Sequence, residues 1–238
     1  MTMPDLSADR TTLHRVAAHV LGRRRHQVSG RFGLRATPGG FGTPAFGDEP
    51  ESVRVSGTTL VREVGGDASY VPIAGSTLRS LAEFAGADIS APFSVGEDGP
   101  EVGDADAPLG LDADGAAALA AWFALGWQVL DTVIAGLGAA GRPATLQLWP
   151  EHFDAGTNVA LASGTRLNLG ASPGDAVSAE PYLYVGPWGP ERPGDTSYWN
   201  APFGALCTWS ALAEGDVVDE GLAFLSRGLT LLAGAAED

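Results

Sequence analysis

The sequence contains no lysine, because all 14 basic residues are arginines. Without lysine the chain can form no Schiff base with a substrate or with pyridoxal phosphate, and it cannot supply the lysine of a Walker A phosphate loop. This absence excludes several common routes to enzymatic chemistry. The alanine-, glycine- and arginine-rich composition is typical of a high-GC genome, which by itself accounts for the missing lysine.

Cysteine is nearly absent as well. Cys207 is the single cysteine, so no intramolecular disulfide can form, which suits a reducing compartment. The first ten residues contain acids and a proline but no apolar stretch of the kind found in a signal peptide. We therefore expect a cytoplasmic protein.

Positive charge is scarce relative to negative charge, and the formal net charge is -15. Such a surface repels phosphate backbones and anionic lipids, so we expect neither nucleic acid nor a membrane as a partner. One long apolar run, residues 116–137, approaches the length of a membrane-spanning helix. It contains Asp131 and is not flanked by a basic cluster, which favours a helix buried all round in a soluble core.

The pattern of apolar residues predicts an α+β fold. Helical spacing from Leu13 to Leu21 predicts a helix, with Asp9 as its cap and Arg23–Arg25 in a solvated last turn. Further predicted elements are a hairpin of residues 52–55 and 58–64 turning at Ser56-Gly57, strands at 145–149, 158–162, 165–169, 182–185 and 204–210, and a final helix at 217–232. We expect mostly antiparallel sheets packed on the long buried helix.

The two halves of the chain resemble each other weakly. Residues 29–39 are similar to residues 163–174, and residues 79–87 are similar to residues 227–235, in the same order. This order predicts a single globular domain, residues 1–238, with an internal pseudo-twofold duplication of halves 9–110 and 111–235. Chance similarity in an alanine- and glycine-rich chain is the alternative.

The densest group of reactive side chains follows the predicted strand that ends at Trp149. If the backbone stays extended past Pro150, His152 and Asp154 lie on one face and Glu151 on the other. A His-x-Asp pair can supply two ligands to a divalent metal such as zinc, iron or manganese. Glu180 is the first candidate for a further ligand, with Asp175 and His26 as others.

The same pair has two other interpretations. The carboxylate of Asp154 can orient His152 as a general base, with Glu151 as a further catalytic candidate. Alternatively, His152 is structural, and its ring hydrogen-bonds a nearby acid or carbonyl. The sequence leaves all three interpretations open.

Aromatic residues gather in the C-terminal half of the sequence. Tyr182 and Tyr184 share one strand face, and Trp149, Trp199 and Asn200 are further candidates for contact with a ligand. Aromatic walls with a few polar groups hold apolar or ring-bearing small molecules. They also fill protein cores, which is the alternative.

The segment Trp149-Pro150-Glu151-His152-Phe153-Asp154 resembles an uncharacterised bacterial domain family that is common in high-GC species and has a His-Phe-Asp motif after a strand. The hairpin at 53–63 is similar to that family's N-terminal half, and the stretches 181–184 and 198–209 are similar to its later aromatic strands. This chain is shorter and its loops differ. No activity is established for the family, so the resemblance implies only the fold boundaries and the choice of His152 and Asp154.

Three functions of different kinds follow from these patterns. The first is a small-molecule enzyme, assisted by a divalent metal, centred on His152 and Asp154. The alternative is a protein that binds a small molecule in an aromatic-lined pocket without catalysis, or a homo-oligomeric interaction protein whose aromatic residues bury against a second copy.

Overall fold

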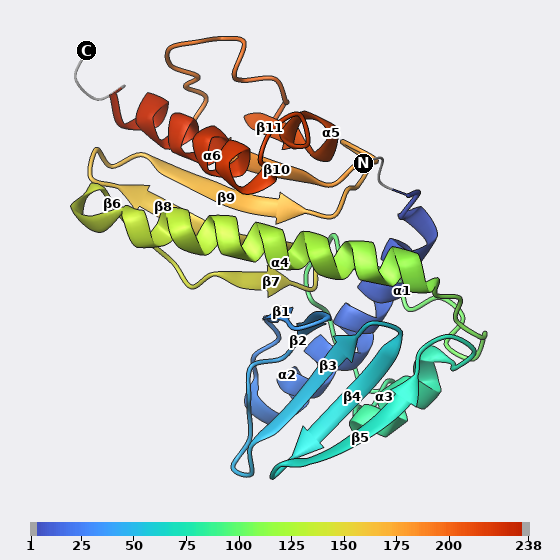
Figure 1. Ribbon diagram of the computed structural model, residues 1–238. Coiled ribbons are helices and arrows are strands. Elements are labelled where there is room, and N and C mark those ends of the chain that lie inside the picture. Colours follow the sequence, from blue (N-terminus) through green and yellow to red (C-terminus); the bar gives the residue numbers. More distant parts are fainter. Residues whose placement is uncertain (1–3, 235–238) are drawn as a thin grey trace. The chain divides into compact units, whose positions relative to one another are not determined.

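The computed structural model describes residues 4–234 and has an α+β fold with antiparallel sheets, as predicted (Figure 1). The chain divides into two compact units. The N-terminal unit contains residues 4–124 together with Gln147–Phe153, and the C-terminal unit contains Leu125–Leu146 and residues 154–234. Each unit is described separately below.

The N-terminal unit begins with one continuous helical segment of three parts. These are α1 (Ser7–Val16), the π-helical segment η1 (Ala17–Gly22) and α2 (Arg23–Ser29), which ends at the left-handed Gly30. π-helical turns are rare and often occur at functional sites. Asp9 is not the helix cap. It lies inside the first turn, and its carboxylate accepts a hydrogen bond from the amide of Asp112.

The three arginines of this segment do not form a solvated helix end, so that expectation was wrong. Arg23 is buried, and its guanidinium donates to the carbonyls of Asp88 and Ala91. Arg24 forms an ion pair with Glu51. The pattern of three consecutive arginines gave no sign of these partners, because all of them lie beyond residue 50.

A five-stranded antiparallel meander follows the helix, in the order β1 (Arg35–Thr37), β2 (Gly40–Gly42), β3 (Glu51–Ser56), β4 (Thr59–Val64) and β5 (Asp67–Pro72). The predicted hairpin is confirmed, but its turn is Gly57-Thr58 and not Ser56-Gly57, because Ser56 pairs with Thr59 and Gly57 has the positive φ. Helix α3 (Leu78–Ala85) is capped by Thr77, not by Ser76, and the side chain of Ser80 completes a capping box.

Residues 86–112 form a long connection without a helix or a strand element between α3 and α4. Unstructured connections longer than about 15 residues are uncommon in compact domains and often functional. A stripe of polar side chains on the N-terminal helical segment donates hydrogen bonds to the carbonyls of this loop. We call it the donor stripe; its members are Thr12, Arg15, His19, Arg23 and Gln27.

The donor stripe follows one helix face, because its members are spaced three or four residues apart. The loop runs along it in the opposite direction. Thr12 bonds Gly110 near the end of the loop, and Gln27 bonds Asp88 near its start. Each bond satisfies a carbonyl that lacks a partner in a helix or a sheet.

The core of the N-terminal unit contains an aromatic cluster. The rings of Phe41, Phe123 and Phe153 meet edge to face, with centroids 5.1–5.7 Å apart, and His14 stacks on Phe153 at 5.2 Å. The three phenylalanines are almost completely buried. Strand β7 (Gln147–Trp149) joins this unit through a bridge between Leu34 and Leu148.

Helix α4 (Ala113–Gly136) is the predicted long helix, and its first half belongs to the N-terminal unit. Phe123 and Leu130 are fully buried, while Gln128 and Asp131 are exposed, so the helix is buried along one side and not all round as expected. Among residues 4–234 it alone has the length and hydropathy to span a membrane. A single helix of this kind is also found in soluble proteins and is compatible with one.

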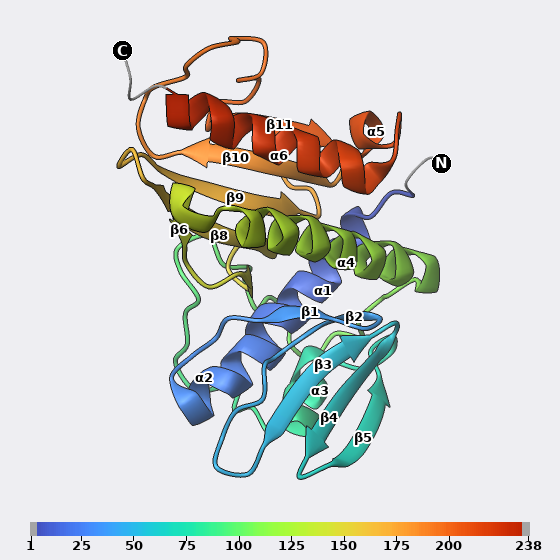
Figure 2. The same ribbon diagram turned by 60° about the vertical axis from the view of Figure 1, so that its left-hand side comes forward.

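The C-terminal unit contains an antiparallel sheet in the order β11 (Ala205–Thr208), β10 (Tyr182–Pro187), β9 (Arg166–Ser172), β8 (Asp154–Leu161) and β6 (Gly141–Pro143). The 3₁₀ turn η2 (Gly138–Ala140) precedes β6, and α5 (Trp209–Leu212) follows β11. Helix α6 (Val217–Gly234) lies along β10 and β11 (Figure 2). Its Gly221 and Gly228 allow close approach to Leu183 and Val185.

The segments that suggested a duplication lie in elements of the same type. Residues 29–39 include β1, and residues 163–174 include β9. Residues 79–87 overlap α3, and residues 227–234 lie in α6, whereas Ala235 lies outside the described residues. However, β1 is a three-residue edge strand, and β9 lies inside its sheet. The duplication of halves 9–110 and 111–235 stays a prediction.

Candidate functional site

The backbone does not stay extended past Pro150, so the predicted shared face of His152 and Asp154 does not form. Residues 150–153 form a turn, and Phe153 has a φ of 58°, the single positive value for a non-glycine residue in the described chain. A left-handed conformation at a side-chain-bearing residue costs about 1–3 kcal/mol and persists where its surroundings enforce it. This turn ends the N-terminal unit, and Asp154 begins strand β8 of the C-terminal unit.

Contacts of Phe153 and hydrogen bonds from His14 enforce the turn. The ring of Phe153 is anchored in the aromatic cluster, and its amide donates to the carbonyl of Trp149. The Nε2–H group of His14 donates to the carbonyls of Pro150 and Glu151, at 3.0 and 3.1 Å. Because the aromatic cluster and His14 hold the backbone of the turn, the side chains of Glu151 and His152 extend toward solvent. Their exposed fractions are 23% and 50%.

A third side chain, Asp98, joins this pair from the long loop. One ligand atom each of Asp98, Glu151 and His152 lies within 4.8 Å of the others. Gly96 makes this approach possible, because a Cβ atom at that position would overlap the carboxylate of Glu151. Its φ of 137° is also a conformation that other residues rarely adopt. We call these three side chains the Asp98–Glu151–His152 group.

Sequence reasoning named Glu151 and His152 as candidates but placed their side chains on opposite faces of a strand, and it missed Asp98. The acidic stretch 97–106 resembles an ordinary solvated loop. Its position depends on hydrogen bonds to the donor stripe some 80 residues earlier, such as that from His19 to Pro100. Gly96 is the one local sign that the loop approaches another segment closely, and the sequence does not show that this segment contains Glu151.

Asp154 has a different environment. Its side chain is 6% exposed and accepts a hydrogen bond of 2.5 Å from the hydroxyl of Tyr184. The tyrosine ring lies across Gly170 of the neighbouring strand, where any Cβ atom would overlap it. Burial, and then the charge of Asp154, raise the pKa of Tyr184 well above its ordinary value. Tyr184 therefore stays protonated and donates to the carboxylate.

A second tyrosine–aspartate pair lies two residues earlier on the same face of β10. The hydroxyl of Tyr182 donates to Asp175 at 2.6 Å, and burial together with this carboxylate raises the pKa of Tyr182. Glu180 accepts hydrogen bonds from the amide and hydroxyl of Ser210 at the start of α5. Asp154 and Glu180, both predicted as metal ligands, thus have partners within the C-terminal unit. His26 is exposed and lies beside Phe93.

The remaining ligand-binding candidates make structural contacts. The indole of Trp199 donates to the carbonyl of Pro193. The amide side chain of Asn200 both donates to and accepts from the backbone of Leu206. Trp149 lies near Phe32 in the N-terminal unit, with ring centroids 6.5 Å apart. The structure therefore keeps Tyr182 and Tyr184 together on β10 and uses the polar side-chain atoms of Trp199 and Asn200 in hydrogen bonds to the backbone.

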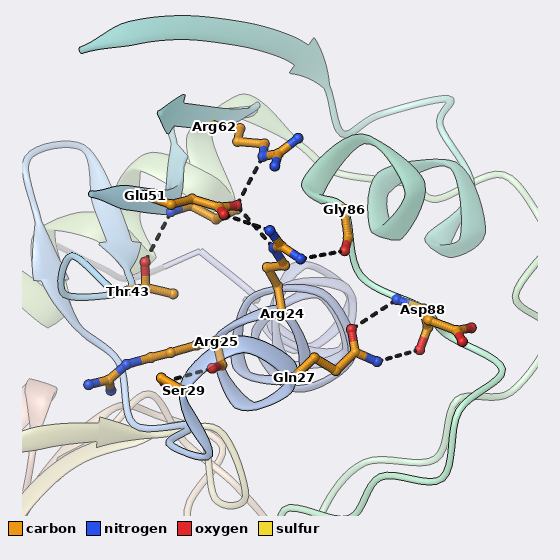
Figure 3. A network of polar contacts seen from close by, with 10 residues as sticks. Arg24, Arg25, Gln27, Ser29, Thr43, Glu51, Arg62, Gly86 and Asp88 are labelled. Carbon is orange, nitrogen blue, oxygen red and sulfur yellow. Dashed lines mark hydrogen bonds and ion pairs between the residues drawn. The ribbon is translucent and has the colours of Figure 1, made fainter. Parts of the chain in front are cut away.

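A second polar cluster in the N-terminal unit is centred on Glu51 (Figure 3). Its carboxylate is 6% exposed and binds Arg24 at 2.7 and 3.1 Å and Arg62 at 3.0 Å. Arg24 also donates to the carbonyl of Gly86. Burial opposes ionisation of Glu51, but the two arginines outweigh it and lower its pKa. Because both arginines are paired, this cluster joins the helix to the sheet and is not a free anion site.

The chain was compared with known proteins at three levels. No family model, no curated protein and no solved structure matches it. The similarity to a family with a His-Phe-Asp motif therefore stays a prediction, and the function has to be argued from the geometry.

Acid is expected to weaken the N-terminal unit through His19. Its ring is 6% exposed; Nε2–H donates to the carbonyl of Pro100, and Nδ1 has no hydrogen-bond partner among residues 4–234. Burial lowers the pKa of His19 and outweighs the hydrogen bond to Pro100, which raises it; the nearby Arg23 and Arg15 lower the pKa further, against a smaller opposing effect of Glu101. Protonation would bury an additional charge and an unpaired N–H group.

The direction of this pH effect follows from the difference in proton binding between the folded and the unfolded chain. In the unfolded chain His19 has a pKa of about 6.5, so its contribution to stability is complete above that pH. The contribution is lost as the pH falls below about 6.5, because the unfolded chain then binds a proton that the folded chain does not. Urea unfolding from about pH 7.5 to about pH 5 should show this loss, and a His19→Gln variant should show a shallower one. Equal slopes in both proteins would contradict the assignment to His19.

Proposed function

We propose that this protein is a small-molecule enzyme that binds a divalent metal ion through Asp98, Glu151 and His152. The observation that carries the proposal is the convergence of three ligand atoms from two distant segments of the sequence. One imidazole nitrogen and two carboxylate oxygens form a donor set that suits zinc, iron and manganese. The ligands differ from the predicted His152, Asp154 and Glu180, but the centre at His152 is kept.

The dimensions of the group fit an ion after a small adjustment. Zinc binds nitrogen and carboxylate oxygen at about 2.0–2.2 Å, so two ligand atoms of a tetrahedral site lie about 3.3–3.6 Å apart. The atoms here lie within 4.8 Å of one another. Asp98 and His152 are exposed, and their side chains can rotate to close the remaining distance of about 1.5 Å at most. The two carboxylates also attract a cation.

Three protein ligands leave a coordination position open, which distinguishes catalytic from structural zinc sites. When bound, the metal would supply Lewis acidity and lower the pKa of a coordinated water to about 7. The half-exposed imidazole of His152 leaves that position accessible to solvent and small solutes. Three further residues hold the ligands in place: Phe153 and His14 fix the backbone of the turn, and Gly96 lets the loop approach Glu151.

Metal binding is the first expected result. Isothermal titration of the untagged protein with Zn²⁺ and with Mn²⁺, and elemental analysis after dialysis, should give about one ion per chain. His152→Ala and Asp98→Asn should each weaken binding at least about tenfold, because even outer-shell changes cost about 10–100-fold. Glu101→Gln is the matched control, since it removes an exposed carboxylate three residues from Asp98.

Several outcomes would count against the proposal. Absence of bound metal in the wild-type protein after incubation with zinc, manganese or ferrous iron would overturn it. Equal losses in Asp98→Asn and Glu101→Gln would show that cations respond only to the negative charge of the surface. Hydrolysis of chromogenic ester and phosphate-ester substrates, abolished by a chelator and by His152→Ala, would support the enzymatic part of the proposal.

A further inference from the structure

The two segments that carry the Asp98–Glu151–His152 group are both held by the N-terminal helical segment, and in each case a histidine makes the bond. His14 donates to the carbonyls of Pro150 and Glu151, on the turn. His19 donates to the carbonyl of Pro100 at 2.7 Å, two residues after Asp98 on the loop. One rigid element thus contacts the backbone beside all three candidate ligands.

The change from α-helix to π-helix between His14 and His19 affects which segments the two side chains reach. His14 lies in α1, and His19 lies in the π-helical segment that begins at Ala17. A π turn contains one more residue than an α turn, so it changes the direction in which later side chains point. Both imidazoles face carbonyl oxygens, which only accept hydrogen bonds, so Nε2 carries the proton in each ring.

We propose that His14 and His19 are positioning residues that bring Asp98 within ligand distance of Glu151 and His152. This inference rests on the proposed function. A loop of 27 residues samples many conformations, and ordering it on metal binding would cost conformational entropy. The two histidines fix the backbone on both sides of the site before an ion binds. They act on the metal only through the segments that they hold.

Other members of the donor stripe bind the same loop at residues outside the site. Arg15 bonds Val102 and Asp104, whereas Arg23 and Gln27 bond the loop at Asp88 and Ala91. Gln27 makes two hydrogen bonds to Asp88, ten residues before Asp98. Loss of Gln27 should therefore loosen the start of the loop without moving Asp98, which makes Gln27→Leu a matched control.

The test compares a glutamine and an asparagine substitution at each of the two histidines. A glutamine places its NH₂ group close to the position of imidazole Nε2, whereas the shorter asparagine stops near Nδ1. We expect Zn²⁺ titration to give His19→Gln an affinity close to that of the wild-type protein. We expect His19→Asn to bind Zn²⁺ about tenfold more weakly, in the range known for outer-shell changes. His14→Gln and His14→Asn should differ in the same direction, and Gln27→Leu should bind as the wild type does.

Hydrogen exchange without metal provides the second measurement. Amides of residues 96–102 should exchange faster in His19→Asn than in His19→Gln, because only the longer side chain holds Pro100. If the wild-type protein binds no Zn²⁺, the proposed function fails and this inference fails with it. If the wild type binds Zn²⁺ but the Gln and Asn variants bind it equally well, the function stands and the positioning role is overturned. An equal loss in Gln27→Leu would also overturn it, because any loosening of the loop would then suffice.

Discussion

Phe153→Ala should lower the free energy of unfolding by about 3–5 kcal/mol, the usual cost of removing a fully buried phenylalanine ring. Phe153 is 1% exposed and contacts Phe41, Phe123 and the ring of His14. The alanine leaves a cavity in the aromatic cluster and retains the unfavourable left-handed backbone. Urea unfolding followed by tryptophan fluorescence measures the effect.

A glycine at the same position separates the ring from the backbone. Phe153→Gly also removes the ring, but glycine adopts a φ of 58° without strain. The glycine variant should therefore be at least as stable as Phe153→Ala, although glycine normally destabilises a folded chain. Val28→Ala, at a side chain that is 43% exposed, should change stability little. A loss below about 1 kcal/mol in Phe153→Ala would show that the cluster does not hold the turn.

The second large effect is expected at Glu51. Glu51→Ala should cost about 3–5 kcal/mol, because it leaves the guanidinium groups of Arg24 and Arg62 without their shared carboxylate in a largely buried place. Acid should have a similar but partial effect. The folded-state pKa of Glu51 is lowered, so its contribution is present above the unfolded value of about 4.3 and is lost as the pH falls through the folded value.

An exposed ion pair in the same unit is the control for this result. Arg79 and Asp106 form a two-bonded pair at 2.7 and 3.0 Å, but both side chains are well exposed. Asp106→Ala should therefore destabilise the protein far less than Glu51→Ala, because solvent screens the exposed pair. Thermal unfolding of the two variants at one pH makes the comparison. Equal losses would mean that the burial of Glu51 contributes nothing.

Local patterns in the sequence predicted many of the elements, because neighbouring residues decide them. The turn at Gly57 sets the register of β3 and β4, and alternating burial along β3 matches the alternation of apolar residues. The final helix was also predicted, and Asp216 begins it by accepting from the amides of Val218 and Asp219. Such signals need no knowledge of distant partners.

The candidate site depended on long-range contacts, and there the sequence was less informative. A histidine and an aspartate two residues apart share a strand face only if the intervening backbone is extended, and Phe153 adopts a left-handed φ because its ring is held by Phe41 and Phe123. No periodicity encodes that contact. Asp98 was missed for the same reason, since its place depends on hydrogen bonds between the loop and the donor stripe.

The N-terminal unit is assembled from two stretches of chain that are separated by Leu125–Leu146. A ribosome that has made residue 124 has supplied most of this unit, yet β7, Phe153 and two of the three candidate ligands are still unsynthesised. Domains generally fold in the order of their synthesis, but this one has to wait for part of its neighbour to be translated. A nascent chain arrested before residue 147 would therefore expose the rings of Phe41 and Phe123 that Phe153 covers in the complete unit, which makes that interval of translation the one most open to chaperone binding.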